Sequence, residues 1–420
     1  MKMRRVAGIA VKIFLGVFVL GIAGIIALLA WVNWQVPAEV TLPKPTGPYA
    51  VGRALFDWTD TKRIDPFAPT LGTSREITGW IWYPAEASSE PIAEYQPKAV
   101  RDALLKRANR VVAFVAKLVT VDQANVHSHA LERPAVLRQP QTFPVVLMKP
   151  GYGGLIHQYS AFAEDLASYG YVVVGSDSPY TTPVVVYKDG RVANQSKAGH
   201  PPENTPGRKS ALAPGLPNDL MLPAAKVWAE DMRFMLDRLQ EINAAGSTEM
   251  FAGRLDIHSV GAFGHSFGGS ASLQFCKDDA RCGAVINVDG GLWGDVALGG
   301  LKKPALFMMS DRPVFRVPVA SLEPNARAIV EAIEHIRSEL PNKPNQLILK
   351  GSGHYNFADA ALLTEQHVAR WTGSIGPIDQ RRALEVDRRY IRAFFDTYLK
   401  GKPDVLLQGA SPNYPEVIIK

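Results

Sequence analysis

The 420-residue chain has the composition of a globular protein large enough for one catalytic domain with insertions. Hydrophobic residues make up 47% of it and charged residues 20%, a balance that excludes an intrinsically disordered chain. The formal charge is +6, but Lys2, Arg4, Arg5 and Lys12 supply four of these charges before the first acidic residue, Glu39. This leaves no basic face for nucleic acid, and we expect no such partner.

An uncharged apolar stretch, residues 13–32, lies near the start of the chain. As a helix it would extend about 30 Å, the thickness of the hydrocarbon core of a bilayer. Basic residues precede it, and Trp31 and Trp34 lie at its far end, where interfacial aromatic residues are typical. We interpret residues 1–34 as a transmembrane anchor with its N-terminus in the cytosol. A cleaved signal peptide, which would make the protein secreted, is the alternative, and both place the remaining chain outside the cytosol.

The next part of the chain predicts a spacer, two strands and a basic helix. Residues 35–48 are Pro-rich, as linkers often are. Apolar residues alternate in the stretch that follows, and this predicts an antiparallel strand pair at 49–58 and 75–85. Residues 98–118 combine a helical period with six basic side chains. Such a helix either binds a membrane surface or packs its apolar face on the domain, and both interpretations remain open.

From residue 143 onward, strand and helix patterns alternate. The runs FPVVLM and YVVVGSD flank a helical segment, 157–169, which predicts a βαβ unit of a mostly parallel sheet. A Pro- and Gly-rich region at 188–223 predicts a lid or surface insertion, and a helix at 224–243 follows. Further strands are expected at 259–265, 283–289, 304–311 and 345–354, and further helices at 326–340 and 383–399.

The stretch GAFGHSFGGSAS (261–272) contains the spacing G-x-S-x-G, with Ser266 between Gly264 and Gly268. An apolar strand pattern precedes it and a small-residue helix pattern follows, which is the context of a nucleophile elbow. We therefore predict a nucleophilic serine in an α/β-hydrolase fold, a mostly parallel central sheet flanked by helices. The predicted catalytic domain spans 49–405, with insertions near 98–138 and 185–223, and residues 406–420 form a C-terminal tail.

A serine nucleophile needs a histidine base, and three histidines follow Ser266 in the chain: His335, His354 and His367. His354 follows the strand-like run LILKGSG, where hydrolases place their histidine. The other two lie in or beside helical patterns, where surface residues are expected. We predict His354 as the base.

The acid that orients this base has two candidates from the residues alone. Asp289 and Asp311 each end an apolar strand after Ser266. The general hydrolase order, in which the acid follows a later strand, favours Asp311.

Four stretches resemble the plasma-type platelet-activating factor acetylhydrolase family, a phospholipase-A2-like branch of the α/β-hydrolases. They are GPYAVGRALFDWTD with WYPAE, GHSFGG, RCGAVINVDGGLWG and GSGHYNFAD, and the resemblance extends in order over about 47–401. It implies that Asp289, in the earlier strand, is the acid, with Asp311 as the alternative. The chain departs from the family where two glycines follow Asp289 and where MKPGYGG replaces the usual His-Gly of the oxyanion loop.

An oxyanion hole requires backbone N–H groups beside the nucleophile. We expect them from Phe267, which follows Ser266, and from Tyr152, in the glycine-rich loop after FPVVLMKPG. The expected reaction is ester hydrolysis through an acyl-enzyme, with no metal and no organic cofactor.

The resemblance implies that the substrate is a glycerophospholipid with a short or oxidised sn-2 acyl group, taken from a lipid surface. A broad carboxylesterase or polyester-type hydrolase of small esters is the alternative. A binding protein on an inactive hydrolase fold is disfavoured, because serine, acid and histidine are all present in order. The two cysteines, Cys276 and Cys282, are expected either to form a disulfide outside the cytosol or to remain as two buried thiols. The sequence does not specify an oligomeric state.

Overall fold

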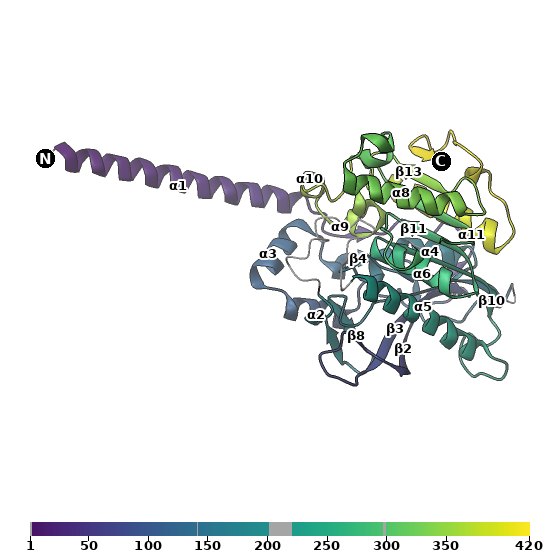
Figure 1. Ribbon diagram of the computed structural model, residues 1–420. Coiled ribbons are helices and arrows are strands. Elements are labelled where there is room, and N and C mark those ends of the chain that lie inside the picture. Colours follow the sequence, from purple (N-terminus) through teal and green to yellow (C-terminus); the bar gives the residue numbers. More distant parts are fainter. Residues whose placement is uncertain (1, 141, 201–220, 297–299) are drawn as a thin grey trace.

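The computed structural model describes residues 2–140, 142–200, 221–296 and 300–420. Helix α1 (Lys2–Gln35) projects away from a body formed by the rest of the described chain (Figure 1). Within these residues, α1 is the one helix long and apolar enough to cross a membrane, over Phe14–Gln35. A signal sequence can meet the same criteria of length and composition.

The body is built on one ten-stranded sheet in the order β14-β13-β12-β11-β10-β6-β7-β3-β2-β5. The six strands from β13 to β7 run parallel, while β14 and β3 are antiparallel to their neighbours β13 and β7. Most central strands are continuous buried apolar runs, as expected where helices cover both faces of a sheet. The sheet strands are β2 (Ala50–Ile64), β3 (Ser74–Ala85), β5 (Leu131–Glu132), β6 (Phe143–Lys149), β7 (Val172–Ser176), β10 (Leu255–His265), β11 (Cys282–Val288), β12 (Ala305–Ser310), β13 (Gln346–Leu349) and β14 (Val417–Ile419).

Helices pack on both faces of this sheet through two separate apolar clusters. The first cluster joins the sheet to α5, α6 and α8, and the second joins it to α4 and α11. This is the mostly parallel α/β arrangement that the alternating sequence pattern predicts. The helices of the body are α2 (Lys98–Arg107), α3 (Arg110–Val119), α4 (Ser160–Ser168), α5 (Met221–Asn243), α6 (Phe267–Asp278), α8 (Pro324–Glu339), α9 (Ala360–Leu363), α10 (Gln366–Trp371) and α11 (Gln380–Leu399).

The predicted antiparallel pair at the start of the domain is confirmed as β2 and β3. Successive side chains of a strand point to opposite faces of the sheet. In β3, Ile77 and Ile81 accordingly join the first cluster, while Trp80 and Trp82 join the second. The strand is therefore buried on both faces.

The single helix predicted at 98–118 is two helices, α2 and α3. The chain becomes extended at Ala108 and Asn109, and the Asn109 side chain accepts a hydrogen bond of 2.8 Å from Val111 N–H. This N-cap starts a new helix with its own direction. The region predicted as a lid or surface insertion at 188–223 contains β9 (Val192–Asn194), which pairs with β8 (Val184–Val186) just before it, while residues 201–220 lie outside the described residues.

Two segments expected to flank the domain pack against it. Within 35–48, β1 (Val40–Thr41) pairs with β4 (Val126–His127), and Val40 and Leu42 are buried. Within 406–420, β14 adds an edge strand to the sheet beside β13. Both segments therefore belong to the body, because each forms backbone ladders with it.

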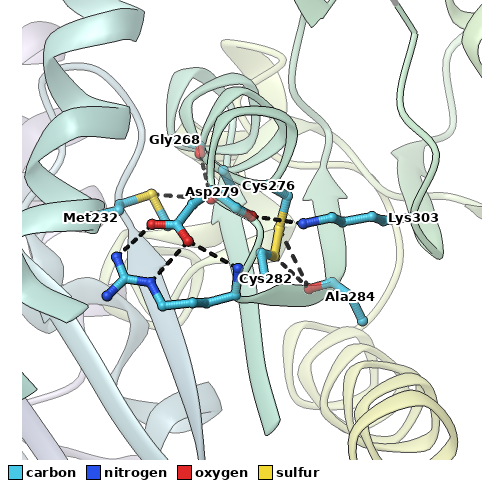
Figure 2. The surroundings of a disulfide bond; sticks show 9 residues. Met232, Gly268, Cys276, Asp279, Cys282, Ala284 and Lys303 are labelled. Atoms are coloured by element: carbon cyan, nitrogen blue, oxygen red, sulfur yellow. Dashed lines mark hydrogen bonds and ion pairs between the residues drawn. A yellow bond between two sulfur atoms is a disulfide. The ribbon is translucent and has the colours of Figure 1, made fainter. Parts of the chain in front are cut away.

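Cys276 in α6 and Cys282 at the start of β11 are joined in a disulfide (Figure 2). Nearby, Lys303 Nζ donates to the carbonyl oxygen of Asp279 at 2.7 Å. The disulfide closes the short turn that leads from the end of α6 into β11.

Candidate active site

Ser266 occupies a sharp turn between β10 and α6. Its φ is 54° and its ψ is −122°, a conformation that side-chain-bearing residues rarely adopt. Glycine allows the close approach on both sides: a Cβ on Gly264 would lie 2.3 Å from the Gly268 carbonyl carbon, and one on Gly268 would lie 2.4 Å from the Lys149 oxygen. The G-x-S-x-G spacing is thus a steric requirement of this turn, which has the strand-to-helix geometry expected of a nucleophile elbow.

The structure brings together the acid and the base that the family resemblance implies. Asp289 follows β11, and its Oδ2 lies 2.6 Å from Nδ1 of His354, which follows β13. The other oxygen, Oδ1, accepts hydrogen bonds from the N–H and hydroxyl of Ser310 at 2.9 and 2.8 Å. Asp289 is thereby fixed on one side and bonded to the imidazole on the other.

Asp311, the alternative acid, makes different contacts. Its Oδ2 accepts a hydrogen bond from Gly351 N–H at 2.6 Å, and its Oδ1 pairs with Arg316 at 2.5 Å. Asp311 therefore braces the loop that carries the histidine, while Asp289 bonds to the histidine itself. The general strand-order argument for Asp311 does not describe this arrangement.

His354 also lies beside the elbow, since its ring centroid is 4.4 Å from that of His265, the residue before Ser266. The two other downstream histidines are placed elsewhere. His335 is an exposed residue of α8 near Glu339, and the ring of His367 contacts Trp31 of α1.

Arg312 is a residue of the site that the sequence analysis missed. Its Nη2 donates to Asp289 Oδ2 at 2.7 Å and lies 3.3 Å from His354 Nδ1. Burial alone would raise the pKa of Asp289, but the hydrogen bond from His354 and the charge of Arg312 hold that pKa well below its ordinary value. Asp289 therefore remains a carboxylate. The sequence signal that could have identified Arg312 was its position directly after the predicted strand that ends at Asp311.

The two residues expected to form the oxyanion hole lie side by side. The rings of Tyr152 and Phe267 meet edge to face at 5.6 Å, and both contact Trp228 of α5, at 6.1 and 4.8 Å. Neither backbone N–H donates to any other residue that the structure describes. The loop that contains Tyr152 also lies against Ser266, because a Cβ on Gly151 would be 3.2 Å from Ser266 Cβ.

A buried polar network lies behind this loop. Lys149 Nζ, at the end of β6, donates to Ser176 Oγ at 2.7 Å and Ser178 Oγ at 2.9 Å, and lies 3.6 Å from Asp231 Oδ2. Burial lowers the pKa of Lys149 to about 8, although Asp231 opposes this shift. Arg75 pairs with the same Asp231 at 2.6 Å. The strand end that leads into the oxyanion loop is thus tied to α5 by buried charges, which the sequence alone did not reveal.

With this geometry established, comparison with known proteins places the chain. It matches the model of the family described as "Platelet-activating factor acetylhydrolase, isoform II" over residues 35–187 and 237–410. The chain belongs to this family. The match begins at residue 35, the last residue of α1, and the part between its two segments includes residues 201–220, which the structure leaves undescribed.

Named relatives and one solved structure are similar over most of the chain. A probable 1-alkyl-2-acetylglycerophosphocholine esterase of Arthroderma benhamiae is 28% identical, covering 91% of this chain and 95% of the relative. The platelet-activating factor acetylhydrolase of Cavia porcellus is 23% identical, covering 86% and 78%. A ferulic acid esterase structure from Streptomyces cinnamoneus superposes with a TM-score of 0.71 at 28% identity, covering 91% and 99%.

These findings confirm the predicted α/β-hydrolase fold and the family resemblance. The chain is a serine ester hydrolase of the platelet-activating factor acetylhydrolase type.

Proposed function

We propose that the chain hydrolyses short or oxidised sn-2 acyl esters of glycerophospholipids through an acyl-enzyme at Ser266. The observation that carries this proposal is the 2.6 Å contact between Asp289 and His354 beside the strained elbow of Ser266. A serine hydroxyl is a weak nucleophile until a neighbouring base removes its proton, and this arrangement supplies that base.

In the proposed reaction, His354 Nε2 takes the proton of Ser266 Oγ as that oxygen bonds to the ester carbonyl carbon. The backbone N–H groups of Phe267 and Tyr152 hold the resulting oxyanion, each contributing roughly 3–4 kcal/mol to the transition state. His354 then gives its proton to the departing alcohol. A water molecule, deprotonated by His354, releases the acid from Ser266. Asp289 orients the imidazole and stabilises its cation throughout.

A lipid substrate is supported by the names of the relatives and by the surface of α3. Val111, Val112 and Phe114 are 68%, 63% and 59% exposed, and no residue of α3 is buried. An apolar helix face of this kind is unfavourable in water and suits a lipid surface. Arg101 and Arg107 of α2, by contrast, bond to groups outside this helix: Arg107 bonds to Gln195 Oε1 at 3.0 Å, for example.

The position of α3 beside α1 supports the same surface. Asn33, near the end of α1, donates to the carbonyl oxygens of Lys117 and Leu118 at 3.4 Å. Figure 1 shows α3 next to the point where α1 enters the body. We propose that α1 is a membrane anchor and that α3 rests on the same bilayer. The charged residues of α3 are Arg110 and Lys117, so this helix carries no acidic side chain that an anionic lipid surface would repel.

We further propose that residues 1–34 anchor the chain with its N-terminus in the cytosol and the catalytic body outside. The basic residues before the apolar stretch favour this orientation. The disulfide between Cys276 and Cys282 is compatible with an oxidising compartment.

A second candidate function is hydrolysis of small esters, including those of aromatic acids. The observation that favours it is the aromatic group of Tyr152, Trp228 and Phe267 beside the elbow, together with the likeness to a ferulic acid esterase. The same catalytic residues would serve both substrates.

The decisive experiment measures hydrolysis by the full chain in phospholipid micelles. One headgroup is kept while the sn-2 chain varies from acetyl to palmitoyl, beside a p-nitrophenyl ester and ethyl ferulate. A steep preference for short sn-2 chains supports the lipid proposal. Turnover of the small esters alone would replace it with the second candidate.

Two pairs of variants complete this test. Ser266→Ala should abolish all hydrolysis. Ser272→Ala, in the helix that follows, should not, since among the described residues the Ser272 hydroxyl bonds to Gly268 C=O and Met232. Retained turnover in Ser266→Ala would remove the assigned nucleophile. Phe114→Asp should slow hydrolysis in vesicles but not of the soluble ester, and equal loss on both substrates would exclude a lipid-facing role for α3.

A further inference from the structure

Two buried side chains connect the oxyanion loop to the histidine loop behind Ser266. Tyr159 Oη accepts a hydrogen bond from Gly151 N–H at 3.1 Å and lies 2.8 Å from His265 Nδ1. The other ring nitrogen of His265, Nε2, lies 2.9 Å from the backbone carbonyl oxygen of His354. Both Tyr159 and His265 are 3% exposed.

The chemistry of the partners fixes the direction of every bond in this chain. A carbonyl oxygen only accepts, so His265 must carry its proton on Nε2 and donate it to His354 C=O. Burial lowers the pKa of His265 to about 3, so the ring is neutral and its Nδ1 is an acceptor. Burial also raises the pKa of Tyr159, which keeps its proton and donates it to His265. The Tyr159 oxygen is then free to accept from Gly151 N–H.

The two ends of this series of hydrogen bonds lie at the two groups that the proposed reaction needs, the oxyanion donor and the base. Gly151 precedes Tyr152, whose N–H is a proposed oxyanion donor, and the carbonyl group at the other end belongs to His354, the proposed base. A Cβ on Gly151 would lie 3.3 Å from His265 Nδ1. The chain of hydrogen bonds through Tyr159 and His265 therefore passes directly behind Ser266. Gly151 N–H is bonded to Tyr159 and is therefore not available to an oxyanion, which agrees with the assignment of Tyr152 N–H as the donor from this loop.

We propose that Tyr159 and His265 are positioning residues that hold the oxyanion loop and His354 in register around Ser266. This inference rests on the proposed function of Ser266 and His354. Oxyanion stabilisation requires donors placed within a few tenths of an ångström, and a single chain of directed bonds supplies that placement across two loops that are distant in sequence.

The test is kinetic and uses the full chain with a soluble p-nitrophenyl ester. Tyr159→Phe removes both hydroxyl bonds but keeps the ring, and we expect kcat per active site to fall about 10- to 100-fold with KM little changed, because only the transition state uses the oxyanion donors. Tyr83→Phe is the matched control: this buried tyrosine donates to the Pro134 carbonyl at 2.8 Å and packs in the first apolar cluster, whereas Tyr159 packs in the second, so the substitution should leave kcat unchanged.

Two substitutions of His265 separate the halves of the chain. His265→Asn retains an oxygen near the Nδ1 position, which accepts from Tyr159, and loses the bond to His354. His265→Gln retains an N–H near the Nε2 position, which donates to His354, and loses the bond to Tyr159. We expect each to retain more activity than His265→Leu, which loses both bonds. Equal activity of all three would contradict the proposal.

A trifluoromethyl ketone distinguishes positioning from loss of structure. Ser266 Oγ adds to its carbonyl carbon, the hydroxyl proton passes to His354 and the new oxyanion occupies the hole. Its inhibition constant should rise in parallel with the fall in kcat/KM across the variants. Titration with an organophosphonate, which reacts with an intact active-site serine, counts the fraction of molecules with a working site. A variant that does not fold is recognised in this way, and the folded variants then test the proposal.

The outcomes for this inference and for the proposed function are distinct. If Ser266→Ala is inactive while folded Tyr159→Phe and His265→Leu keep the kcat of the parent, the positioning role is overturned and the nucleophile stands. If Ser266→Ala is active, the proposed function itself fails.

Discussion

Asp289 Oδ2 accepts from two donors at once: His354 Nδ1 at 2.6 Å and Arg312 Nη2 at 2.7 Å. The guanidinium group therefore lies beside the imidazole on the same carboxylate oxygen, with its Nη2 3.3 Å from His354 Nδ1. Charge-assisted bonds of this length fix the carboxylate more firmly than neutral ones would. Arg312 also donates to Ser310 Oγ at 3.0 Å, so the arginine, the serine and the aspartate form one braced unit.

Arg312→Gln should therefore reduce kcat by roughly tenfold, because Asp289 loses a charge-assisted hydrogen bond and its pKa rises toward the ordinary value. Arg312→Lys should recover part of the loss, since an ammonium group retains the charge without the fork geometry. Steady-state kinetics on a soluble ester measure both. A Gln variant as active as the parent would show that Ser310 alone suffices to hold Asp289.

Asp289→Asn should lower kcat about 10³- to 10⁴-fold, because the amide no longer selects the productive tautomer of His354. Asp311→Asn should cost less than about tenfold, since Asp311 supports the loop through Gly351 and Arg316 without touching the imidazole. The two variants are compared under one condition by kcat. The reverse ranking would transfer the role of the acid to Asp311.

Glu164→Gln should make stability less sensitive to pH. Burial raises the pKa of Glu164 from 4.5 to about 7, although it accepts hydrogen bonds from His129 and Ala130 N–H. Between these two values the folded protein holds a proton that the unfolded chain releases, so the parent loses stability as pH rises through this window. The variant should gain up to about 3 kcal/mol over the parent by pH 7.

Urea unfolding at pH 4.5 and pH 7 measures this difference. Glu331→Gln, an exposed substitution in α8, provides the baseline and should show no such trend. If the stability gained by Glu164→Gln over the parent became smaller toward pH 7, the predicted loss of parent stability with rising pH would be wrong.

Loss of the disulfide should weaken the body without changing its chemistry. Cys276 and Cys282 enclose a short turn, and the chain-entropy account gives about 2 kcal/mol for a loop of this size. Cys276→Ala with Cys282→Ala should therefore unfold at lower urea concentration yet keep the kcat of the parent. A large fall in kcat would instead show that the bond positions Ser266 and Asp289, which lie at the other ends of α6 and β11.

Deletion of residues 1–34 should leave an active body, because the family match begins at residue 35. Turnover of a soluble ester should be retained, while turnover of a vesicle-embedded substrate should fall. Failure of the truncated chain to fold would mean that the contacts between Asn33 and α3 are part of the body's stability.

The parts of this structure that follow from local sequence pattern were predictable. Ser266 and His354 each follow a strand in a glycine-containing turn, and such turns leave a strong signal in a short stretch of sequence. The choice between Asp289 and Asp311 was not local. It depended on which strand end lies nearest the imidazole, and the family resemblance supplied that information.

The parts that depend on distant contacts were missed. Arg312, Tyr159 and the network of Lys149 act through partners from other strands and helices, so no periodicity identifies them. The same is true of β14, a short strand whose only distinguishing feature is the exposed edge of β13 that it covers. The break between α2 and α3 rests on one capping asparagine within an otherwise continuous helical pattern.

The uninterrupted course of α1 into the body has a kinetic consequence. Helix α1 continues to Gln35, and Asn33 is already bonded to α3, so no flexible linker separates the helix from the body at this point. If α1 spans a bilayer as proposed, the active site is confined to a layer at the surface of that one bilayer. The rate would then follow the mole fraction of susceptible ester among the surrounding lipids, so that diluting the ester with inert lipid would slow turnover even at constant bulk concentration.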